Sequence, residues 1–172
     1  MDFSFHEYIR TVPDFPKEGI LFKDITPLLQ NKKALHIAIN RMVEPYIDQD
    51  IEYVCGIESR GFIFATAIAF RLNAGMIPIR KRGKLPWKTQ TIEYDLEYGT
   101  DHLQIHEDAI PNQGKVLMVD DLLATGGTME AACKLVESLG GMIHSCLFLV
   151  ELEFLNGRDR LSKYHIHSLV KY

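Results

Sequence analysis

The 172-residue sequence lacks the features that mark several common classes of protein. No apolar run approaches the roughly 20 residues of a membrane-spanning helix. The first residues, MDFSFHEYIR, lack the charged and then apolar regions of a signal peptide. Positive charge is also scarce, because 19 Lys and Arg against 23 Asp and Glu leave a net charge of −4, whereas general nucleic-acid binding needs a basic surface. We therefore predict a cytoplasmic protein that binds neither membranes nor nucleic acid.

Cysteine is also rare and shows no metal-binding or disulfide pattern. The three cysteines, Cys55, Cys133 and Cys146, lie in apolar surroundings, and no CxxC pair occurs. This usage is typical of a reduced protein whose thiols are small core residues. His165 and His167 share one face of a predicted strand, but no third ligand accompanies them, so we expect no metal site there.

Hydrophobic patterning predicts a chain in which strands alternate with helices. Helices are expected at residues 3–10, from Asn31 to about residue 46, at residues 62–72, and from the TGGT segment to Gly140. Strands are expected at residues 52–58, 75–80, 91–99, 101–108, 115–123, 142–152 and 166–172. Prolines and a glycine make much of residues 11–29 irregular. The expected fold class is α/β, a mostly parallel central sheet with helices on both faces, in one domain spanning residues 1–172.

The stretch VDDLLATGGTMEAA (residues 119–132) places glycines and threonines between a predicted strand and a predicted helix. Gly126 and Gly127 allow a ligand to approach the backbone closely. The helix that follows presents unpaired N–H groups at its positive end, and Thr125 and Thr128 add hydroxyl donors. We therefore expect residues Ala124–Thr128, hereafter the phosphate seat, to bind one phosphate group.

The same stretch carries two carboxylates, Asp120 and Asp121, several residues before the phosphate seat. An extended strand separates them from a bound phosphate, and carboxylates there suit ribose hydroxyls or the water shell of Mg²⁺. The common nucleotide motifs GxxxxGK[ST] and GxGxxG are absent. The pattern predicts a sugar-phosphate site, and the alternative is a helix-capping turn with a solvated acidic pair.

VDDLLATGGT resembles the phosphoribosyl-pyrophosphate (PRPP) motif of the type I phosphoribosyltransferases, and LLATGGT resembles the adenine phosphoribosyltransferases among them. Further segments resemble that family in the same order: PDFPKEGILFKDITPLL (13–29), GIESRGFIF (56–64), IRKRGKLP (79–86) and YDLEYGTDHLQIHEDAI (94–110). Together these segments are spread over residues 13–128, and chance similarity does not explain their shared order. The resemblance implies the type I phosphoribosyltransferase fold, with an N-terminal base-binding segment at residues 1–30 and a flexible lid hairpin at residues 81–106.

The resemblance also implies a reaction, the conversion of adenine and PRPP into AMP and pyrophosphate in purine salvage, by a homodimer. PRPP would carry Mg²⁺, with no direct metal ligand, and Asp120 and Asp121 would hold the ribose hydroxyls and organise the ion. The implied pyrophosphate-binding residues are Ser59, Arg60, Arg80, Lys81, Lys84 and Tyr98. Cations after a strand end suit a departing pyrophosphate, although a run such as RKRGK is otherwise typical of a solvated loop or a nucleic-acid patch.

The lid would close over the reaction and exclude water, whereas composition alone is equally consistent with a plain surface hairpin. Glu97, in LEYG, would be the general acid/base at the purine ring. The sequence alone does not distinguish it from Glu93 or Asp95. The implied adenine-binding residues are Leu21 and Lys23 through the main chain, Phe22 by stacking, and, on weaker grounds, Leu152.

Two other functions remain open at this point. A hypoxanthine or xanthine phosphoribosyltransferase would use the same fold, but LEYG and GILFKD favour adenine. A non-catalytic PRPP-sensing regulator would be expected to carry a DNA-binding domain or to lack the lid, and the sequence shows neither feature.

Overall fold

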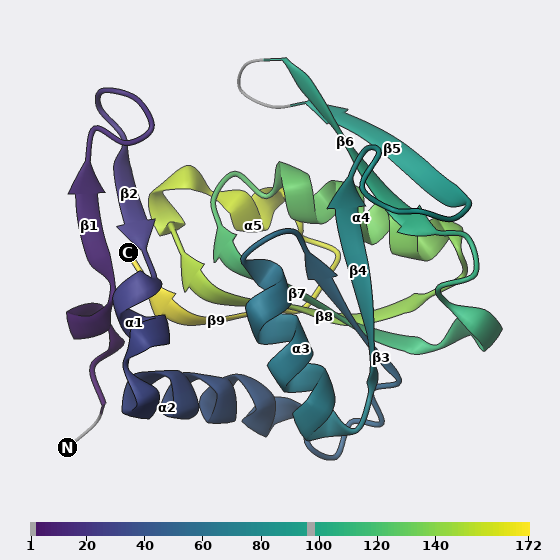
Figure 1. The fold of residues 1–172 in the computed structure, drawn as a ribbon, viewed down its shortest axis with the longest axis horizontal. Helices are drawn as coiled ribbons and strands as arrows, with labels where there is room; N and C mark the ends of the chain where they lie inside the picture. Colours follow the sequence, from purple (N-terminus) through teal and green to yellow (C-terminus); the bar gives the residue numbers. More distant parts are fainter. Residues whose placement is uncertain (1–2, 96–98) are drawn as a thin grey trace. The chain divides into compact units, whose positions relative to one another are not determined.

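The structure is a computed structural model that describes residues 3–95 and 99–172 (Figure 1). The chain forms two compact units, Met1–Arg41 and Met42–Tyr172. We describe each unit by itself.

The N-terminal unit contains an antiparallel hairpin that the sequence pattern did not predict. Its elements are η1 (Phe5–Tyr8), β1 (Arg10–Pro13), β2 (Leu21–Asp24), α1 (Thr26–Gln30) and most of α2 (Lys32–Val43). The helix expected at residues 3–10 is wrong beyond a single 3-10 turn, because Arg10 pairs with Asp24 in the β1–β2 ladder and their charged groups lie 3.7 Å apart. The segment expected to be largely irregular contains this hairpin because Pro13 lies at the end of β1 and Pro16 in the connecting loop, where no ladder N–H is needed.

Helix α2 begins where the sequence predicts. The side-chain oxygen Oδ1 of Asn31 accepts hydrogen bonds from the N–H groups of Lys33 and Ala34, at 3.1 and 3.0 Å. This cap satisfies two amides that have no partner within the first turn. The α-helix gives way to the 3-10 turn η2 (Glu44–Tyr46), because the proline of that turn has no N–H to donate.

The larger unit is built on a seven-stranded sheet with the strand order β5-β6-β4-β3-β7-β8-β9 (Figure 1). Its strands are β3 (Tyr53–Ile57), β4 (Gly75–Lys81), β5 (Thr89–Asp95), β6 (Thr100–His106), β7 (Lys115–Leu123), β8 (Met142–Glu151) and β9 (Ile166–Lys171). Strands β4, β3, β7, β8 and β9 pair in parallel, whereas β6 pairs antiparallel with β4 and β5. The predicted mostly parallel sheet and its attached hairpin are therefore confirmed.

Helices cover both faces of this sheet. The helices are α3 (Gly61–Leu72), α4 (Gly127–Ser138) and the short α5 (Gly157–Arg160). Helix α3 packs against Gly56, where an added Cβ would lie 2.6 Å from the Cβ of Ala65. Ala132 of α4 belongs instead to the core cluster that contains Cys55. Since neighbouring strand residues point to opposite faces, α3 and α4 lie on opposite sides of β3, with α3 in front and α4 behind in Figure 1.

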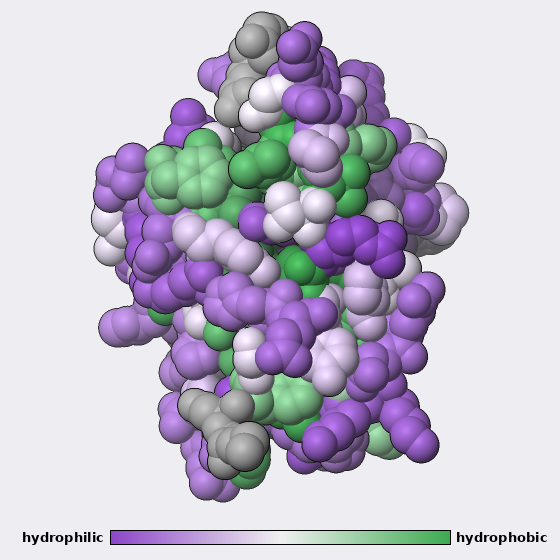
Figure 2. Space-filling view, turned by 90° about the vertical axis from the view of Figure 1, so that its left-hand side faces the viewer, coloured by the Kyte–Doolittle hydropathy of each residue, from purple (hydrophilic) through white to green (hydrophobic). Residues whose placement is uncertain are grey.

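The interior of the larger unit is apolar, and the visible surface is mainly polar. The core cluster between the sheet and α4 draws buried side chains from β3, β4, β6, β7 and β8. The face drawn in Figure 2 carries hydrophilic residues with smaller hydrophobic areas among them. Within the described part of the chain, no helix is both long and apolar enough to cross a membrane.

The carboxyl ends of three neighbouring parallel strands meet at one end of the sheet. Strand β3 ends just before Ser59 and Arg60, β4 ends at Lys81, and β7 runs into the glycine-rich turn before α4. Open α/β sheets bind ligands at this end, where the connections to helices leave a crevice.

Candidate active site

The turn between β7 and α4 places glycine residues at the N-terminus of a 12-residue helix. Gly126 has φ +85°, and an added Cβ there would lie 2.6 Å from the carbonyl oxygen of Gly157. Both the left-handed backbone and this close contact therefore require glycine. The first N–H groups of α4 have no acceptor within the helix, which makes this turn an anion-binding geometry.

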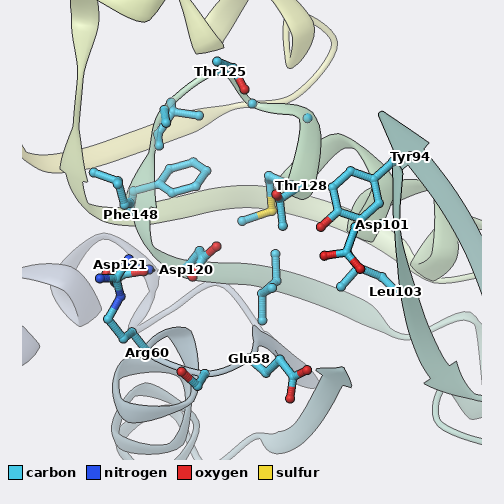
Figure 3. Close-up of a pocket in the computed structure, with 18 of the residues that line it drawn as sticks. Glu58, Arg60, Tyr94, Asp101, Leu103, Asp120, Asp121, Thr125, Thr128 and Phe148 are labelled. Atoms are coloured by element: carbon cyan, nitrogen blue, oxygen red, sulfur yellow. Dashed lines mark hydrogen bonds and ion pairs between the residues drawn. The ribbon is translucent and has the colours of Figure 1, made fainter. Parts of the chain in front are cut away.

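The phosphate seat, Ala124–Thr128, lines a cavity of about 710 Å³ (Figure 3). Its other walls come from the end of β3, the end of β4, the β5–β6 hairpin, β7 and β8. The cavity brings together these predicted residues: Ser59, Arg60, Lys81, Lys84, Asp120, Asp121 and the whole phosphate seat. Hydroxyls, cations and carboxylates that are distant in sequence therefore face one space.

Two adjacent carboxylates, Asp120 and Asp121, line this cavity from β7. The Asp121 side chain is 7% exposed and forms an ion pair with Arg60, with 2.8 Å between Oδ2 and Nε. Figure 3 shows the Arg60 side chain reaching from the start of α3 toward Asp121. Oδ1 of Asp120 accepts a hydrogen bond from the N–H of Asp121 at 2.9 Å.

The same two carboxylates have raised pKa values. Burial and the neighbouring Asp121 charge raise the pKa of Asp120 well above its ordinary value. Burial also raises the pKa of Asp121, against the opposing influence of Arg60. The charged forms of both carboxylates are therefore unfavourable in the ligand-free protein, and a bound cation would stabilise them.

Basic side chains on the lid side of the cavity are held by carboxylates. Nζ of Lys81 lies 2.9 Å from Oδ2 of Asp101, and this hydrogen bond raises the pKa of Lys81. Burial alone would raise the pKa of Asp101, but hydrogen bonds from Lys81 and from the His102 N–H outweigh it and lower that pKa. Both members of the pair are therefore charged at neutral pH.

Glu58 holds the end of β4 from the neighbouring strand. Its Oε1 accepts a hydrogen bond from the Lys81 N–H at 2.6 Å, and its Oε2 accepts one from Nε of Arg80 at 3.0 Å. Arg80 also lies over the ring of Phe62, 5.9 Å from its centre. Arg80 is therefore beside the cavity and is not among the described residues that line it.

Sequence reasoning missed three polar residues that line the cavity: Glu58, Tyr94 and Asp101. Tyr94 and Asp101 are partners across the β5–β6 ladder, and Figure 3 shows both on the side opposite Asp121. Tyr94 is hydrogen-bonded to Thr128 of the phosphate seat, while burial raises its pKa. Strand alternation in the sequence indicates which hairpin residues share a face. It does not indicate which face lines the cavity, because that depends on the pairing of β6 with β4.

The remaining predicted site residues lie elsewhere. Leu152 follows β8, is 8% exposed, and donates its N–H to the carbonyl oxygen of Leu123 at 2.9 Å; it is not among the described lining residues. Leu21, Phe22 and Lys23 form most of β2 in the N-terminal unit. Glu97 and Tyr98 lie outside the described residues.

Comparisons with known proteins agree with this geometry. The family described as "Phosphoribosyl transferase domain" matches residues 27–167. An adenine phosphoribosyltransferase from Nitrosococcus oceani is 54% identical over 164 residues, covering 95% of this chain and 96% of the relative. The crystal structure of the adenine phosphoribosyltransferase from Thermoanaerobacter pseudethanolicus matches with a TM-score of 0.95 and 50% identity, covering 98% of both chains.

A third match adds bound ligands. Adenine phosphoribosyltransferase from Saccharomyces cerevisiae, solved with D-2,5-dideoxy-2,5-imino-altritol 1,6-bisphosphate and adenine, has a TM-score of 0.89 and 38% identity, covering 96% of both chains. Similarity at these levels extends over nearly the whole chain. The chain therefore belongs to the phosphoribosyltransferase family and, within it, to the adenine phosphoribosyltransferases.

Proposed function

We propose that this enzyme transfers the 5-phosphoribosyl group of PRPP to adenine, forming AMP and pyrophosphate in purine salvage. The observation that carries the proposal is the single cavity in which the phosphate seat, the Asp120–Asp121 pair and the basic side chains Arg60 and Lys81 face one another. A sugar with phosphate at one end and pyrophosphate at the other has the complementary arrangement of charge. The yeast relative was solved with a bisphosphorylated imino sugar alcohol and adenine, which supports the same pair of ligands here.

The two ends of PRPP are assigned to different walls of the cavity. The phosphate seat binds the 5′-phosphate through the N–H groups at the positive end of α4 and the threonine hydroxyls. The acid pair accepts hydrogen bonds from the ribose hydroxyls. The residues assigned to pyrophosphate are Ser59, Arg60, Lys81 and Lys84, with Arg80 beside them and Tyr98 from the lid.

The acid pair also suits Mg²⁺ that arrives with PRPP. Mg²⁺ usually keeps several waters and binds through one or two carboxylates together with substrate phosphates. Asp120 and Asp121 are assigned the role of organising this ion, which PRPP carries, through its water shell. The pKa values of both carboxylates are raised, so a nearby cation would stabilise their charged forms. When bound, Mg²⁺ supplies positive charge to the leaving pyrophosphate.

The chemistry assigned to the chain is positioning, charge stabilisation and one proton transfer. Anchoring both ends of PRPP fixes the sugar carbon for attack, which passes through an oxocarbenium-like state. Arg60 and Lys81 stabilise the charge that develops on the departing pyrophosphate. The lid, residues 81–106, closes to exclude water and brings Glu97 to the purine ring as general acid/base.

Adenine binding is assigned to β2 and to the residue after β8. Leu21 and Lys23 bind the base edge through main-chain groups, Phe22 stacks on the ring, and Leu152 contributes a further apolar contact. The ring of Phe22 already meets Phe15 edge to face at 5.1 Å, which shows that it makes aromatic contacts.

We further propose a cytoplasmic homodimer in which residues 1–172 act as one functional domain, with residues 1–30 as its base-binding segment. The family match over residues 27–167 includes parts of both compact units, which supports a single functional domain. Sedimentation analysis of the purified chain tests the dimer, and a monomeric mass would contradict it.

The reaction is tested by supplying purified protein with Mg²⁺, PRPP and one base at a time. Adenine should give AMP, detected by chromatography together with released pyrophosphate, and hypoxanthine or xanthine should give little product. Turnover of hypoxanthine or xanthine without adenine would refute the proposal in favour of a sister enzyme. Binding of PRPP without turnover of any base would favour a PRPP-sensing regulator.

A further inference from the structure

Glu151, the last residue of β8, carries a carboxylate in the interior of the larger unit. Its side chain is 3% exposed. Its Oε1 accepts a hydrogen bond from Nε of Arg158 at 2.6 Å, and its Oε2 accepts one from Nη2 at 2.8 Å. This double contact fixes the guanidinium in one orientation, which a lysine ammonium cannot reproduce.

The Glu151–Arg158 pair is charged but is a weak source of stability. The hydrogen bonds from Arg158 lower the pKa of Glu151, against the effect of burial. Taking the Glu151 charge out of water offsets much of the attraction, and solvent screens the Arg158 side chain, which is 41% exposed, so such a pair adds little to the free energy of unfolding. A role in fixing the position of a neighbouring element therefore accounts for the pair better than stability does.

The element that Arg158 fixes is α5, and α5 lies directly against the phosphate seat. A Cβ added to Gly157 would overlap the carbonyl oxygen of Ala124, and one added to Gly126 would lie 2.6 Å from the carbonyl oxygen of Gly157. The two backbone segments therefore touch with no side chain between them. At the other end of α5, Leu161 is fully buried in the core, which anchors that end and leaves the end beside Gly157 to Arg158.

Glu151 lies beside β7, the strand that leads into the phosphate seat. Glu151 is the register partner of Leu123, the last residue of β7, across the β7–β8 ladder. Neither Glu151 nor any residue of α5 is among the described residues that line the cavity. The pair would therefore affect a bound phosphate through α5, which touches the seat with its backbone at Gly157 and with Nη1 of Arg160, 3.0 Å from where a Cβ on Gly127 would lie.

We infer that Glu151 and Arg158 are positioning residues that hold α5 behind the phosphate seat and thereby set the affinity for the 5′-phosphate of the substrate. The inference rests on the proposed function only for the identity of that phosphate. Displacement of the seat by a fraction of an ångström would misalign several N–H donors at once, while the pyrophosphate side of the cavity would keep its geometry.

The inference is tested by two separate calorimetric titrations of the full chain. One uses ribose 5-phosphate, and the other uses pyrophosphate together with Mg²⁺. In Arg158→Ala we expect the affinity for ribose 5-phosphate to fall about tenfold to a hundredfold, because small misplacements at a binding site have effects of that size. The affinity for pyrophosphate should change less than about threefold, because sites without shared partners couple weakly. In turnover assays the KM for PRPP should rise more than kcat falls. Arg158→Lys should lose an intermediate amount, since it keeps the charge without the double contact.

Gly157→Ala supplies a second test that leaves the ion pair intact. The added methyl group should push the Ala124 carbonyl and weaken ribose 5-phosphate binding in the same way. Gly141→Ala is its matched control, because a Cβ there would lie 2.6 Å from Cγ1 of Val136, at the far end of α4. Lys163→Ala removes the Lys163–Glu137 ion pair, which is the control for losing a salt bridge elsewhere. Both controls should retain ribose 5-phosphate affinity even where thermal stability falls.

Wild-type affinity for ribose 5-phosphate in folded Gly157→Ala and Arg158→Lys proteins would overturn the inference. Equal losses in Gly157→Ala and Gly141→Ala would also overturn it, because general destabilisation would then explain both. If Arg158→Ala does not fold, Gly157→Ala and Arg158→Lys decide the question in the same way. A wild-type protein that fails to convert adenine would refute the proposed function instead, and the comparison with ribose 5-phosphate would still stand.

Discussion

Replacing Asp120 with asparagine should make the ligand-free protein more stable and a weaker binder of PRPP. Asparagine keeps the side-chain volume and an oxygen that can accept the 2.9 Å hydrogen bond from the Asp121 N–H. It removes one of two adjacent charges whose burial and mutual repulsion raise the pKa of Asp120. Removing this unfavourable buried charge should add about 1 kcal/mol to the free energy of unfolding. For a chain of this length, that change raises Tm by about 2–4 °C.

The size of this gain should depend on pH in a defined direction. The pKa of Asp120 is higher in the folded protein than its ordinary value of 3.8, so the folded state binds a proton that the unfolded state releases. The stabilising contribution of that proton is fully present below the unfolded pKa and is lost as the pH rises through the folded pKa. Asp120→Asn should therefore gain least over the wild type in acid and most above the folded pKa.

The assay is thermal unfolding without ligand at a series of pH values above 3.8, the ordinary pKa of Asp120, because the two states differ in protonation only above it. Asp108→Asn, at an exposed position of the same unit, is the control for removing one negative charge, and its Tm should stay near that of the wild type. Saturating PRPP with Mg²⁺, at a hundred times Kd, should stabilise the wild type by about 2.7 kcal/mol and the variant by less at the same concentration. A lower Tm for Asp120→Asn at neutral pH, or a difference that is independent of pH, would refute the reasoning.

Three further substitutions test separate parts of the site. Gly127→Val should lower PRPP affinity about tenfold or more, the effect of losing one hydrogen bond to a charged group. An added Cβ would lie 3.0 Å from Nη1 of Arg160, so the branched side chain should displace the first turn of α4 and its N–H donors. Unchanged PRPP affinity in a binding titration would contradict the assignment of the phosphate seat. Glu97→Gln should lower kcat by about 10²–10⁴ while PRPP affinity is kept, and unchanged single-turnover rates would exclude Glu97 as the acid/base. Phe22→Ala should raise the KM for adenine and leave that for PRPP unaltered, and an unchanged adenine KM would count against stacking.

The sheet could be predicted from the sequence because its signals are local. Apolar runs marked β3, β7 and β8 in the parallel core, and Asn31 marked the start of α2. The β1–β2 hairpin could not be predicted in this way, because its ladder joins Arg10 to Asp24 across a loop that proline and glycine make irregular. Helix α5 was missed because four residues are too few to show a helical period.

The binding site likewise contains residues that the sequence could predict and residues that it could not. Residues Ala124–Thr128 are contiguous, so their chemistry could be interpreted before the fold was known, and the cavity brings all of them together. Tyr94 and Asp101 reach the same cavity only because β6 pairs with β4 and so turns one face of the hairpin toward it. The support behind Gly126 depends on backbone contact with Gly157, which no spacing in the sequence indicates.

The ion pairs inside the cavity explain why one site contains both carboxylates and phosphate-binding groups. Arg60 is held by Asp121 and Lys81 by Asp101, so cations and anions are oriented before a ligand enters, which lowers the entropy lost on binding. A phosphate-rich ligand that carries Mg²⁺ offers a new partner to both members of each pair. A simple anion would satisfy the cations alone and leave a buried carboxylate without its partner, which is unfavourable. We therefore expect the adjacent aspartates to favour a metal-bearing sugar pyrophosphate over phosphate alone, with the glycines of the same turn at its other end.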